Sequence, residues 1–239
     1  MKKKVMTPKE RVSAALSHQE PDRVPLLLSL TMHGARELGL SIREYFSKAE
    51  NVVEGQLRMQ QKYGHDFLNP FFYSALEVEA FGAEVIYSEE GPPNSGRPLI
   101  KEISDIRKLT PPDIRKSGVL YKMLKAIELL REKTQGAIPI LGSVTSPFSI
   151  PVMQLGFDRY FELIHFNREV FDQLMHLNES FCVEWANAQL SAGADAIGYA
   201  DPVSSPTIIP RELYAETGFQ IARRCISKIK GTVTTNFAS

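Results

Sequence analysis

The stretch 193–206 holds the residues of this chain that are best placed to do chemistry. Residues 194–200 are small and apolar, as in a strand buried on both faces, and Asp201 follows where such a strand would end. Pro202 and Pro206 prevent a ladder or a helix between them. Carboxylates at the carboxyl end of a strand are commonly catalytic in parallel α/β proteins. Asp201 is therefore a candidate catalytic residue.

Asp201 could instead have a purely local role, closing a turn while Ser204 or Ser205 helps to cap the following helix. Both interpretations stay open. If the strands are parallel, their carboxyl ends share one face with Asp201, and polar side chains from several segments gather there. The members of this set are Thr31, His33, Tyr73, Glu77, Glu79, Ser143, Ser146, Tyr199, Asp201, Ser204, Ser205 and Asn236.

Glu77 and Glu79 are the other carboxylates of this set. Because they are two residues apart, they cannot share one face of a helix, so we expect one to point into the site and the other away. A buried carboxylate there would have a raised pKa and could act as an acid. The alternative is that both are solvated. We take Asp201 and Glu77 as candidate catalytic residues. Six others are candidate substrate-binding residues: His33, Tyr73, Glu79, Tyr199, Ser205 and Asn236.

Sequence motifs for metal or phosphate binding are absent. His33 follows a predicted strand, where it could contact a ligand or be a hydrogen-bonded structural histidine. The chain has no His-x-x-x-His, His-Glu-x-x-His or His-x-Cys, so no metal site is predicted. It also has no glycine-rich phosphate loop and no Gly-x-Ser-x-Gly nucleophile elbow.

Composition limits the cellular setting and the partners. The 239 residues include 28 basic and 28 acidic side chains, a balance that suggests neither nucleic acid nor an anionic membrane as partner. No run of about eighteen apolar residues and no signal-peptide core occurs, which predicts a cytoplasmic protein. Cys182 and Cys225 lie in helical patterns and are predicted to be buried free thiols.

Helical and strand-like patterns alternate along the chain. Capping-box spacings occur at Thr7 with Glu10, Ser41 with Glu44, and Ser47 with Glu50. The predicted strands are 24–30, 66–72, 138–144, 194–200 and 232–239, with a short one at 83–87. The predicted helices are 8–18, two segments between 41 and 63, 75–81, 117–134, 157–166, 167–190 and 210–230. Residues 91–98 are predicted to form a surface loop.

This alternation predicts βα units around a parallel sheet, in a single domain over residues 1–239. We count about five such units. A closed (β/α)8 barrel needs eight units and typically about 250 residues. Either the sheet is open, or the chain is the first part of a longer barrel.

Four places in the sequence resemble the uroporphyrinogen decarboxylase superfamily, and most closely its corrinoid-dependent branch, the methylcobamide:coenzyme M methyltransferases. The most specific is 194–205 with Pro210, Leu213 and Tyr214 after it. The others are 7–12 with 21–25, 77–84, and 147–149 with 155–157. The resemblance spans nearly the whole chain and implies a (β/α)8 TIM-barrel type of fold, here incomplete and C-terminally truncated.

The resemblance implies transfer of a methyl group from a methylcorrinoid, carried on a partner protein, to a small thiol. In that branch a zinc ion lowers the pKa of the acceptor thiol, and its ligands are a His-x-Cys on the fifth strand and a later cysteine. Here Asn236 and Ala238 stand at the His and Cys positions, and the later cysteine would lie beyond residue 239. Zinc is thus expected from the family, but this chain lacks the ligands.

Two alternatives remain. Uroporphyrinogen decarboxylation would need an arginine-rich loop after the first strand, but residues 32–36 contain one arginine, and the catalytic aspartate and tyrosine of that branch fall at Tyr73 and Met153. The other alternative is a truncated, non-catalytic binding module. Five barrel units would expose the flanks of the first and fifth strands, so self-association as a homo-oligomer is also predicted.

Overall fold

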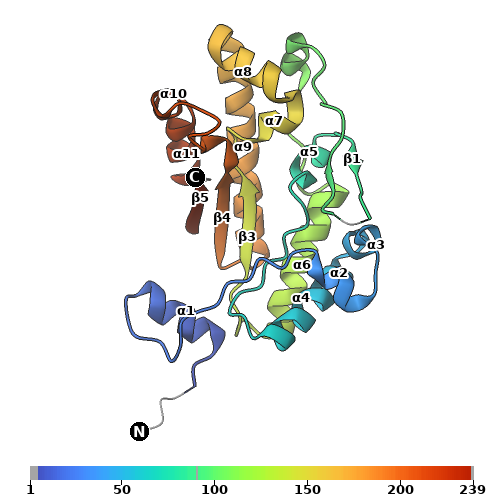
Figure 1. Cartoon of the computed structure of the whole chain (residues 1–239), viewed down its shortest axis with the longest axis vertical. Helices are drawn as coiled ribbons and strands as arrows, with labels where there is room; N and C mark the ends of the chain where they lie inside the picture. The colour runs from blue at the N-terminus through green and yellow to red at the C-terminus, as the bar shows by residue number, and fades with distance from the viewer. Residues whose placement is uncertain (1–4, 90, 238–239) are drawn as a thin grey trace.

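A three-stranded parallel sheet with helices packed around it forms the centre of the molecule (Figure 1). The computed structural model describes residues 5–89 and 91–237. Its strands are β1 (Val85–Ile86), β2 (Asn94–Ser95), β3 (Leu141–Thr145), β4 (Ala196–Asp201) and β5 (Thr232–Phe237). The helices are α1 (Pro8–Leu16), α2 (His33–Leu38), α3 (Ile42–Ser47), α4 (Ala49–Tyr63), α5 (Leu76–Ala80), α6 (Gly118–Thr134), α7 (Ile150–Leu155), α8 (Phe157–Phe166), α9 (Arg168–Ala192), α10 (Arg211–Glu216) and α11 (Gly218–Ile226). Two 3-10 turns, η1 (Ile103–Lys108) and η2 (Pro202–Ser204), complete the elements.

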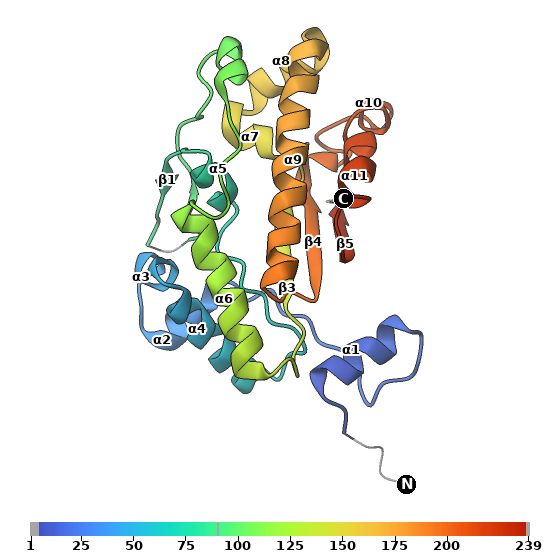
Figure 2. The ribbon, with the colours of Figure 1, turned by 180° about the vertical axis from the view of Figure 1, so that it is seen from behind.

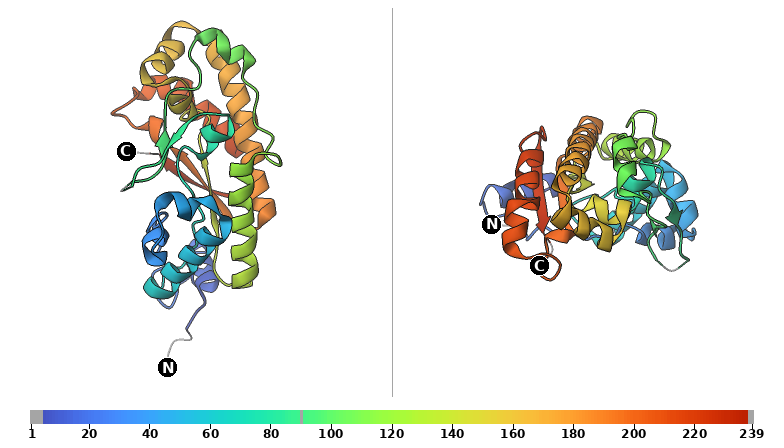
Figure 3. Two further views of the ribbon diagram at one scale, coloured as in Figure 1. Left: turned by 90° about the vertical axis from the view of Figure 1, so that its right-hand side faces the viewer. Right: turned by 90° about the horizontal axis from the view of Figure 1, so that it is seen from above.

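The order of the sheet is β3-β4-β5, with every pair parallel. The register places Thr145 opposite Ala200 and Ala200 opposite Asn236, so these three residues share one face. Helices α9 and α6 run along the back of the molecule (Figure 2), and from above α11, α9 and α6 follow one another in an arc (Figure 3, right). The predicted α/β class with parallel βα units is confirmed, although the described residues form no closed barrel.

The last three predicted strands correspond to β3, β4 and β5, but the first two predictions are wrong. Segment 66–72 contributes only a parallel bridge between Leu68 and Ile140. Segment 24–30 is extended outside any strand, and Val24 is 82% exposed. Pro25 has no backbone donor, and Leu26 O accepts from Asp66 N at 2.8 Å. An apolar run alone does not supply the neighbouring strand that a sheet requires.

Helix predictions are confirmed for α6, α8 and α9, while other boundaries are corrected. The predicted helix 210–230 is divided at Thr217 into α10 and α11, and a Cβ on Gly218 would lie 2.3 Å from the Tyr214 ring. Ser47 does not cap α4, because Lys48 precedes it and the Ser47 hydroxyl donates to Glu44 O. The predicted loop 91–98 contains β2, which pairs with β1 as an antiparallel hairpin.

The capping boxes of α1 and α3 are confirmed, with Thr7 and Ser41 accepting from the backbone N–H of Glu10 and Glu44. The larger core cluster includes buried residues of α4, α6, α9 and the sheet, and within it Trp185 and Phe181 of α9 are almost fully buried. Cys182 and Cys225 are both buried free thiols, as predicted. No helix among the described residues is long and apolar enough to span a bilayer.

A buried ionic network holds the amino-terminal end of the sheet. Arg11 contacts Asp22 at 2.6 Å and Asp66 at 2.5 Å, and Arg23 contacts Asp66 at 2.6 Å. The hydrogen bond from Arg11 holds the pKa of Asp22 well below its usual range. Helix α1 therefore lies at the opposite end of the molecule from α8, leaving the carboxyl ends of the strands free for a site (Figure 1).

Candidate functional site

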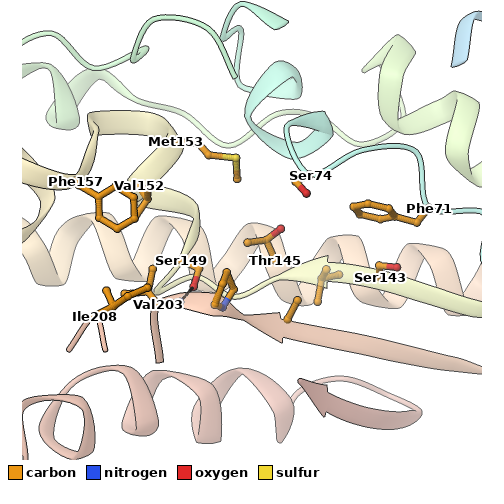
Figure 4. Close-up of a pocket in the computed structure, with 13 residues that line it drawn as sticks. Phe71, Ser74, Ser143, Thr145, Ser149, Val152, Met153, Phe157, Val203 and Ile208 are labelled. Atoms are coloured by element: carbon orange, nitrogen blue, oxygen red, sulfur yellow. Dashed lines mark hydrogen bonds between the residues drawn. The ribbon is translucent and has the colours of Figure 1, made fainter. Parts of the chain in front are cut away.

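A mostly apolar cavity of about 230 Å³ lies at the carboxyl ends of β3 and β4 (Figure 4). Its wall comes from β3, α7 and the segments before α5 and after β4. No charged side chain contributes to it. The lining residues are Phe71, Ser74, Ser143, Val144, Thr145, Ser149, Val152, Met153, Phe157, Ala200, Pro202, Val203 and Ile208. The cavity thus lies where the chemistry of parallel α/β proteins is usually found.

Asp201 lies fully buried at the end of β4, behind the cavity wall. Its Oδ1 accepts hydrogen bonds from the hydroxyls of Ser146 and Ser149, both at 2.6 Å, and its Oδ2 accepts from Tyr214 at 2.8 Å. The carboxylate therefore joins the end of β4 to the turn after β3, to the start of α7 and to α10.

This network positions part of the cavity wall. Ser149 lines the cavity, and its Oγ also accepts from the backbone N–H of Val203 at 3.1 Å. Pro202 and Val203, which follow Asp201 directly, line the cavity as well. The alternative role of a turn residue is partly realised, because Ser204 Oγ donates to Asp201 O, but α10 begins after Pro210 without a side-chain cap.

Glu77 is buried, and both of its carboxylate oxygens accept from the backbone N–H of Thr145, at 3.0 and 3.1 Å. Burial raises the pKa of Glu77 to about 7, although the hydrogen bonds from Thr145 oppose the shift. Glu79 is oriented differently and accepts from the Tyr73 hydroxyl at 2.5 Å. The two glutamates have different partners, but the prediction that one of them points into the site is not met at this cavity. Neither lines the cavity, and Glu77 is not a solvated residue.

The two predicted tyrosines are buried away from the cavity. Tyr73 donates to Glu79 and accepts from the Tyr87 hydroxyl at 3.3 Å. Tyr199 faces the helices from β4, and its hydroxyl has no hydrogen-bond partner. Burial is the main cause that raises the pKa of both hydroxyls far above the ordinary value.

The remaining predicted residues are dispersed. His33 is exposed at the first position of α2, outside the cavity lining. Ser205 is buried, and its hydroxyl lies 2.8 Å from that of Thr207. Asn236 is exposed on the sheet face that bears the cavity-lining Ala200. Ala238 lies outside the described residues.

None of the residues that line the cavity was among the predicted catalytic or substrate-binding residues, and only Ser143 belonged to the wider set of polar side chains expected at the strand ends. Thr145 is two residues from the candidate Ser143 on β3, so strand alternation could have placed both hydroxyls on one face. Val152 and Met153 belong to α7, a helix that the sequence patterns did not predict. Phe71 lies in a segment predicted as a strand.

The donors in the described part of the chain do not fit a zinc ion. Over residues 5–89 and 91–237, no three His, Cys, Asp or Glu side chains converge in an arrangement that could hold a metal. Both cysteines are buried beneath the helices, and His33 is exposed on α2. We therefore derive no chemical step through zinc for this chain.

The comparisons with known proteins agree with the resemblance in the sequence. Methylcobamide:CoM methyltransferase MtbA of Methanosarcina acetivorans is 26% identical over 228 residues, covering 94% of this chain and 67% of that protein. Methylcobamide:CoM methyltransferase MtaA of Methanosarcina barkeri is 25% identical over 216 residues, covering 88% of this chain and 63% of that protein. The chain thus spans about two thirds of the length of these relatives.

A solved structure, a methyltransferase from Methanosarcina mazei, has the same fold over this chain, with a TM-score of 0.87 and 22% sequence identity. The match covers 98% of this chain and 70% of that one. The family model described as Uroporphyrinogen decarboxylase (URO-D) matches residues 7–237. This chain therefore belongs to the uroporphyrinogen decarboxylase family.

Proposed function

We propose that this protein is a corrinoid-dependent methyltransferase of the uroporphyrinogen decarboxylase family. It moves a methyl group from a methylcorrinoid, held by a partner protein, to a small thiol. The names of the two Methanosarcina relatives support this class of donor and acceptor. The incomplete (β/α)8 barrel, the corrinoid partner and the cytoplasmic location are parts of the same proposal.

The character of the cavity is the observation that carries this proposal. A volume of about 230 Å³ with apolar and hydroxyl-bearing walls suits a small thiol and a methyl group. Ligand pockets for larger, drug-sized molecules reach about 300–1,000 Å³. The apolar walls exclude water, which would otherwise solvate and weaken a thiolate nucleophile.

Uroporphyrinogen decarboxylation receives less support from the same cavity. Its substrate is a tetrapyrrole with eight carboxylates, which need cationic partners. Arg36, the one arginine of segment 32–36, is exposed on α2 and does not line the cavity. No lysine or arginine contributes to the cavity wall.

Methyl transfer requires a thiolate in line with the methyl group. The thiol loses its proton, the sulfur forms a bond to the methyl carbon, and the cobalt–carbon bond breaks with its electron pair left on the corrinoid. The chain contributes a wall held in place by Asp201 and the Thr145 hydroxyl on the cavity surface. Zinc, when present in family members, supplies activation of the thiol, and no step here is assigned to it.

Free methylcobalamin and 2-mercaptoethanesulfonate provide the test, with loss of the methyl–cobalt absorbance as the readout. We expect turnover by the wild-type protein. Ser74→Trp should lower the rate by about tenfold or more, because Ser74 is exposed at the cavity and an indole would occlude it. The matched variant Ser29→Trp, at an exposed serine outside the cavity, should stay within about twofold of wild type.

Three other results would contradict the proposal. Release of carbon dioxide from uroporphyrinogen without methyl transfer would assign the chain to the decarboxylase branch. Binding of the thiol or of methylcobalamin with no turnover of either substrate would identify a non-catalytic module. A Ser29→Trp variant as slow as Ser74→Trp would show that the cavity is not the site.

A further inference from the structure

Thr145 separates the cavity from a buried carboxylate. It is the last residue of β3, and its side chain lies among the residues that line the cavity (Figure 4). On the other side of Thr145, Glu77 accepts its backbone N–H, and the Thr145 side chain also favours the charged form of that carboxyl, which opposes the rise in its pKa. One residue thus links the cavity surface to a buried carboxylate.

Among the described residues, no cationic side chain contributes to the pKa of Glu77. From α9, the indole Nε1 of Trp185 faces the carboxylate without the geometry of a full hydrogen bond, and the Cys182 thiol lies nearby. Cys225 of α11 contacts Cys182. The buried side chains of α6 are all apolar, and the buried polar residue of α7, Gln154, is bonded to Asn178.

The nearby acidic groups have partners of their own. Glu79 accepts from Tyr73, and Glu179 of α9 is bonded to Arg224 of α11. In the described residues, Glu77 and Asp201 are the two carboxylates that are buried without a cationic partner and hydrogen-bonded to a residue of the cavity wall. Asp201 already accepts from three hydroxyls, whereas Glu77 accepts from the Thr145 backbone N–H.

We propose that Thr145 and Glu77 form a proton relay for the acceptor thiol. The thiol gives its proton to Thr145 Oγ as the Thr145 hydroxyl gives its own proton to the Glu77 carboxylate. The thiolate then attacks the methyl carbon, and the electron pair of the cobalt–carbon bond stays on the corrinoid. This inference rests on the proposed methyl transfer. Thr145 would touch the substrate, and Glu77 would act through it.

The chemistry of the pair suits this role. A solvated glutamate, with a pKa of about 4.3, is too weak a base to take a proton from a thiol whose pKa is about 8.5. Burial raises the pKa of Glu77 to about 7. This brings it closer to the pKa of the thiol, so proton transfer from the thiol to the carboxylate costs less free energy. A hydroxyl can donate and accept at the same time, so Thr145 can pass a proton without becoming charged.

Thr145 is held in place from two sides, as a relay requires. Its N–H is bonded to Glu77, and its carbonyl oxygen accepts from the Cys182 thiol at 3.7 Å. Its neighbour across the sheet is Ala200, whose side chain leaves the cavity side open. The backbone of Thr145 is therefore held in place between the carboxylate and the cavity.

The test compares the pH dependence of methyl transfer to 2-mercaptoethanesulfonate in three variants. Glu77→Gln keeps an acceptor for the Thr145 N–H but cannot take a proton, and Thr145→Val removes the hydroxyl at nearly constant shape. Each should lower the rate by about a hundredfold and remove the inflection near pH 7. Thr145→Ser, which keeps a hydroxyl, should recover at least about tenfold over Thr145→Val.

A thiol that is already ionised separates proton removal from structural damage. With thiophenol as acceptor above its pKa, Glu77→Gln and Thr145→Val should approach the wild-type rate, since no proton has to be removed. Variants that stay slow with this thiol would overturn the relay. A Glu77→Gln variant with the wild-type pH profile would also overturn the relay. If the wild-type protein transfers methyl groups in the same experiment, the proposed function would still stand.

A direct titration tests the relay even if the wild-type protein transfers no methyl group. The carboxyl stretching band of Glu77, identified by its absence in Glu77→Gln, should titrate near pH 7. Thr145→Val should raise its midpoint, because the hydroxyl hydrogen bond that stabilises the carboxylate is lost. Equal midpoints in the two proteins would mean that the hydroxyl and the carboxylate are not coupled, and would overturn the relay.

Discussion

Asp201 has both carboxylate oxygens engaged by hydroxyl donors, which explains how a fully buried acidic side chain is accommodated. Three donors on a single carboxylate leave little capacity for a substrate. The residue was predicted as catalytic from its place at a strand end, and that place is confirmed. Its contacts favour a role in positioning Ser149, Pro202 and Val203 around the cavity.

Replacing Asp201 should reveal this role in stability as well as in activity. Asp201→Ala leaves the hydroxyls of Ser146, Ser149 and Tyr214 without their acceptor, and we expect the free energy of unfolding to fall by about 3 kcal/mol. Asp201→Asn keeps one carbonyl oxygen for the two serines and should cost about 1 kcal/mol. Urea denaturation measures both.

The control is Glu212→Ala, an exposed carboxylate on the neighbouring α10, expected to change stability by less than about 0.5 kcal/mol. If Asp201→Ala were as stable as this control, the hydrogen bonds from the three hydroxyls would contribute nothing measurable to the free energy of unfolding. Asp201 would then have to be reconsidered as a group that contacts substrate.

The carboxylates of this site were predictable from sequence, whereas most of its wall was not. Glu77 and Asp201 stand out because acidic side chains within or after apolar segments need a reason to be there. Ser149 and Met153 carry no such signal, because their place in the cavity depends on how α7 folds over the end of β3. Predicting them requires the tertiary structure.

At the scale of elements, periodicity predicted the long helices and the later strands well. Helices α6, α8 and α9 and strand β4 follow their patterns because each buries a regular face. Segment 24–30 has the same apolar character as β4 but lies outside any strand. Strand formation needs a hydrogen-bonded neighbour, and the pattern of one segment contains no information about that neighbour.

The ionic network at the base of the sheet allows a matched comparison of two arginines. Both contact Asp66, but the side chain of Arg11 is 6% exposed and that of Arg23 is 45% exposed. Arg11→Met should lower the free energy of unfolding by about 3–5 kcal/mol, since it leaves Asp66 and Asp22 without their buried partner. Arg23→Met should cost about 1 kcal/mol, because the Arg23 side chain is 45% exposed and the buried Asp66 keeps Arg11 as its partner.

Limited proteolysis gives a second measure of the same contrast. Loss of Arg11 should release α1 from the sheet and expose the turn at 17–24 to cleavage, whereas Arg23→Met should be cut at nearly the wild-type rate. Equal loss of stability in the two variants would mean that burial does not decide the strength of this network.

In the whole molecule, the ionic network that stabilises the fold and the cavity proposed for catalysis lie at opposite ends of the sheet. The ionic network lies at the amino ends of the strands, and the cavity lies at their carboxyl ends. The sequence predicted that polar residues gather at the carboxyl ends of parallel strands, but it did not predict the ionic network at the amino ends. It also did not predict that, among the described residues, the central parallel sheet has three strands where about five βα units were expected.

Glu77 should give the stability of the whole molecule a distinct pH dependence. The pKa of Glu77 is about 7 in the folded protein, compared with the ordinary glutamate value of 4.5 expected in the unfolded chain. Below pH 4.5 it is protonated in both states; between 4.5 and 7 the unfolded chain loses the proton first. Stability should therefore fall by about 3 kcal/mol as the pH rises through this window, and Glu77→Gln should abolish that fall.

The difference between wild type and Glu77→Gln, measured by urea denaturation at each pH, isolates this effect. Asp22 does not interfere, because its lowered pKa confines its contribution to more acidic conditions, where its stabilisation is lost. Parallel stability curves for the two proteins between pH 4.5 and 7 would show that Glu77 has no raised pKa.

The two buried thiols allow the local opening of this chain to be measured by their rate of reaction with a thiol reagent. Cys182 lies in α9 and Cys225 in α11, both sealed from solvent at the seam between these helices. A thiol reagent can reach either sulfur only when the seam parts, so its rate of reaction counts the openings of α11. If the two sulfurs react at the same rate, and that rate equals the rate of global unfolding, the sheet and its helices open as one cooperative unit. If they react sooner, α11 leaves its place while the cavity remains assembled.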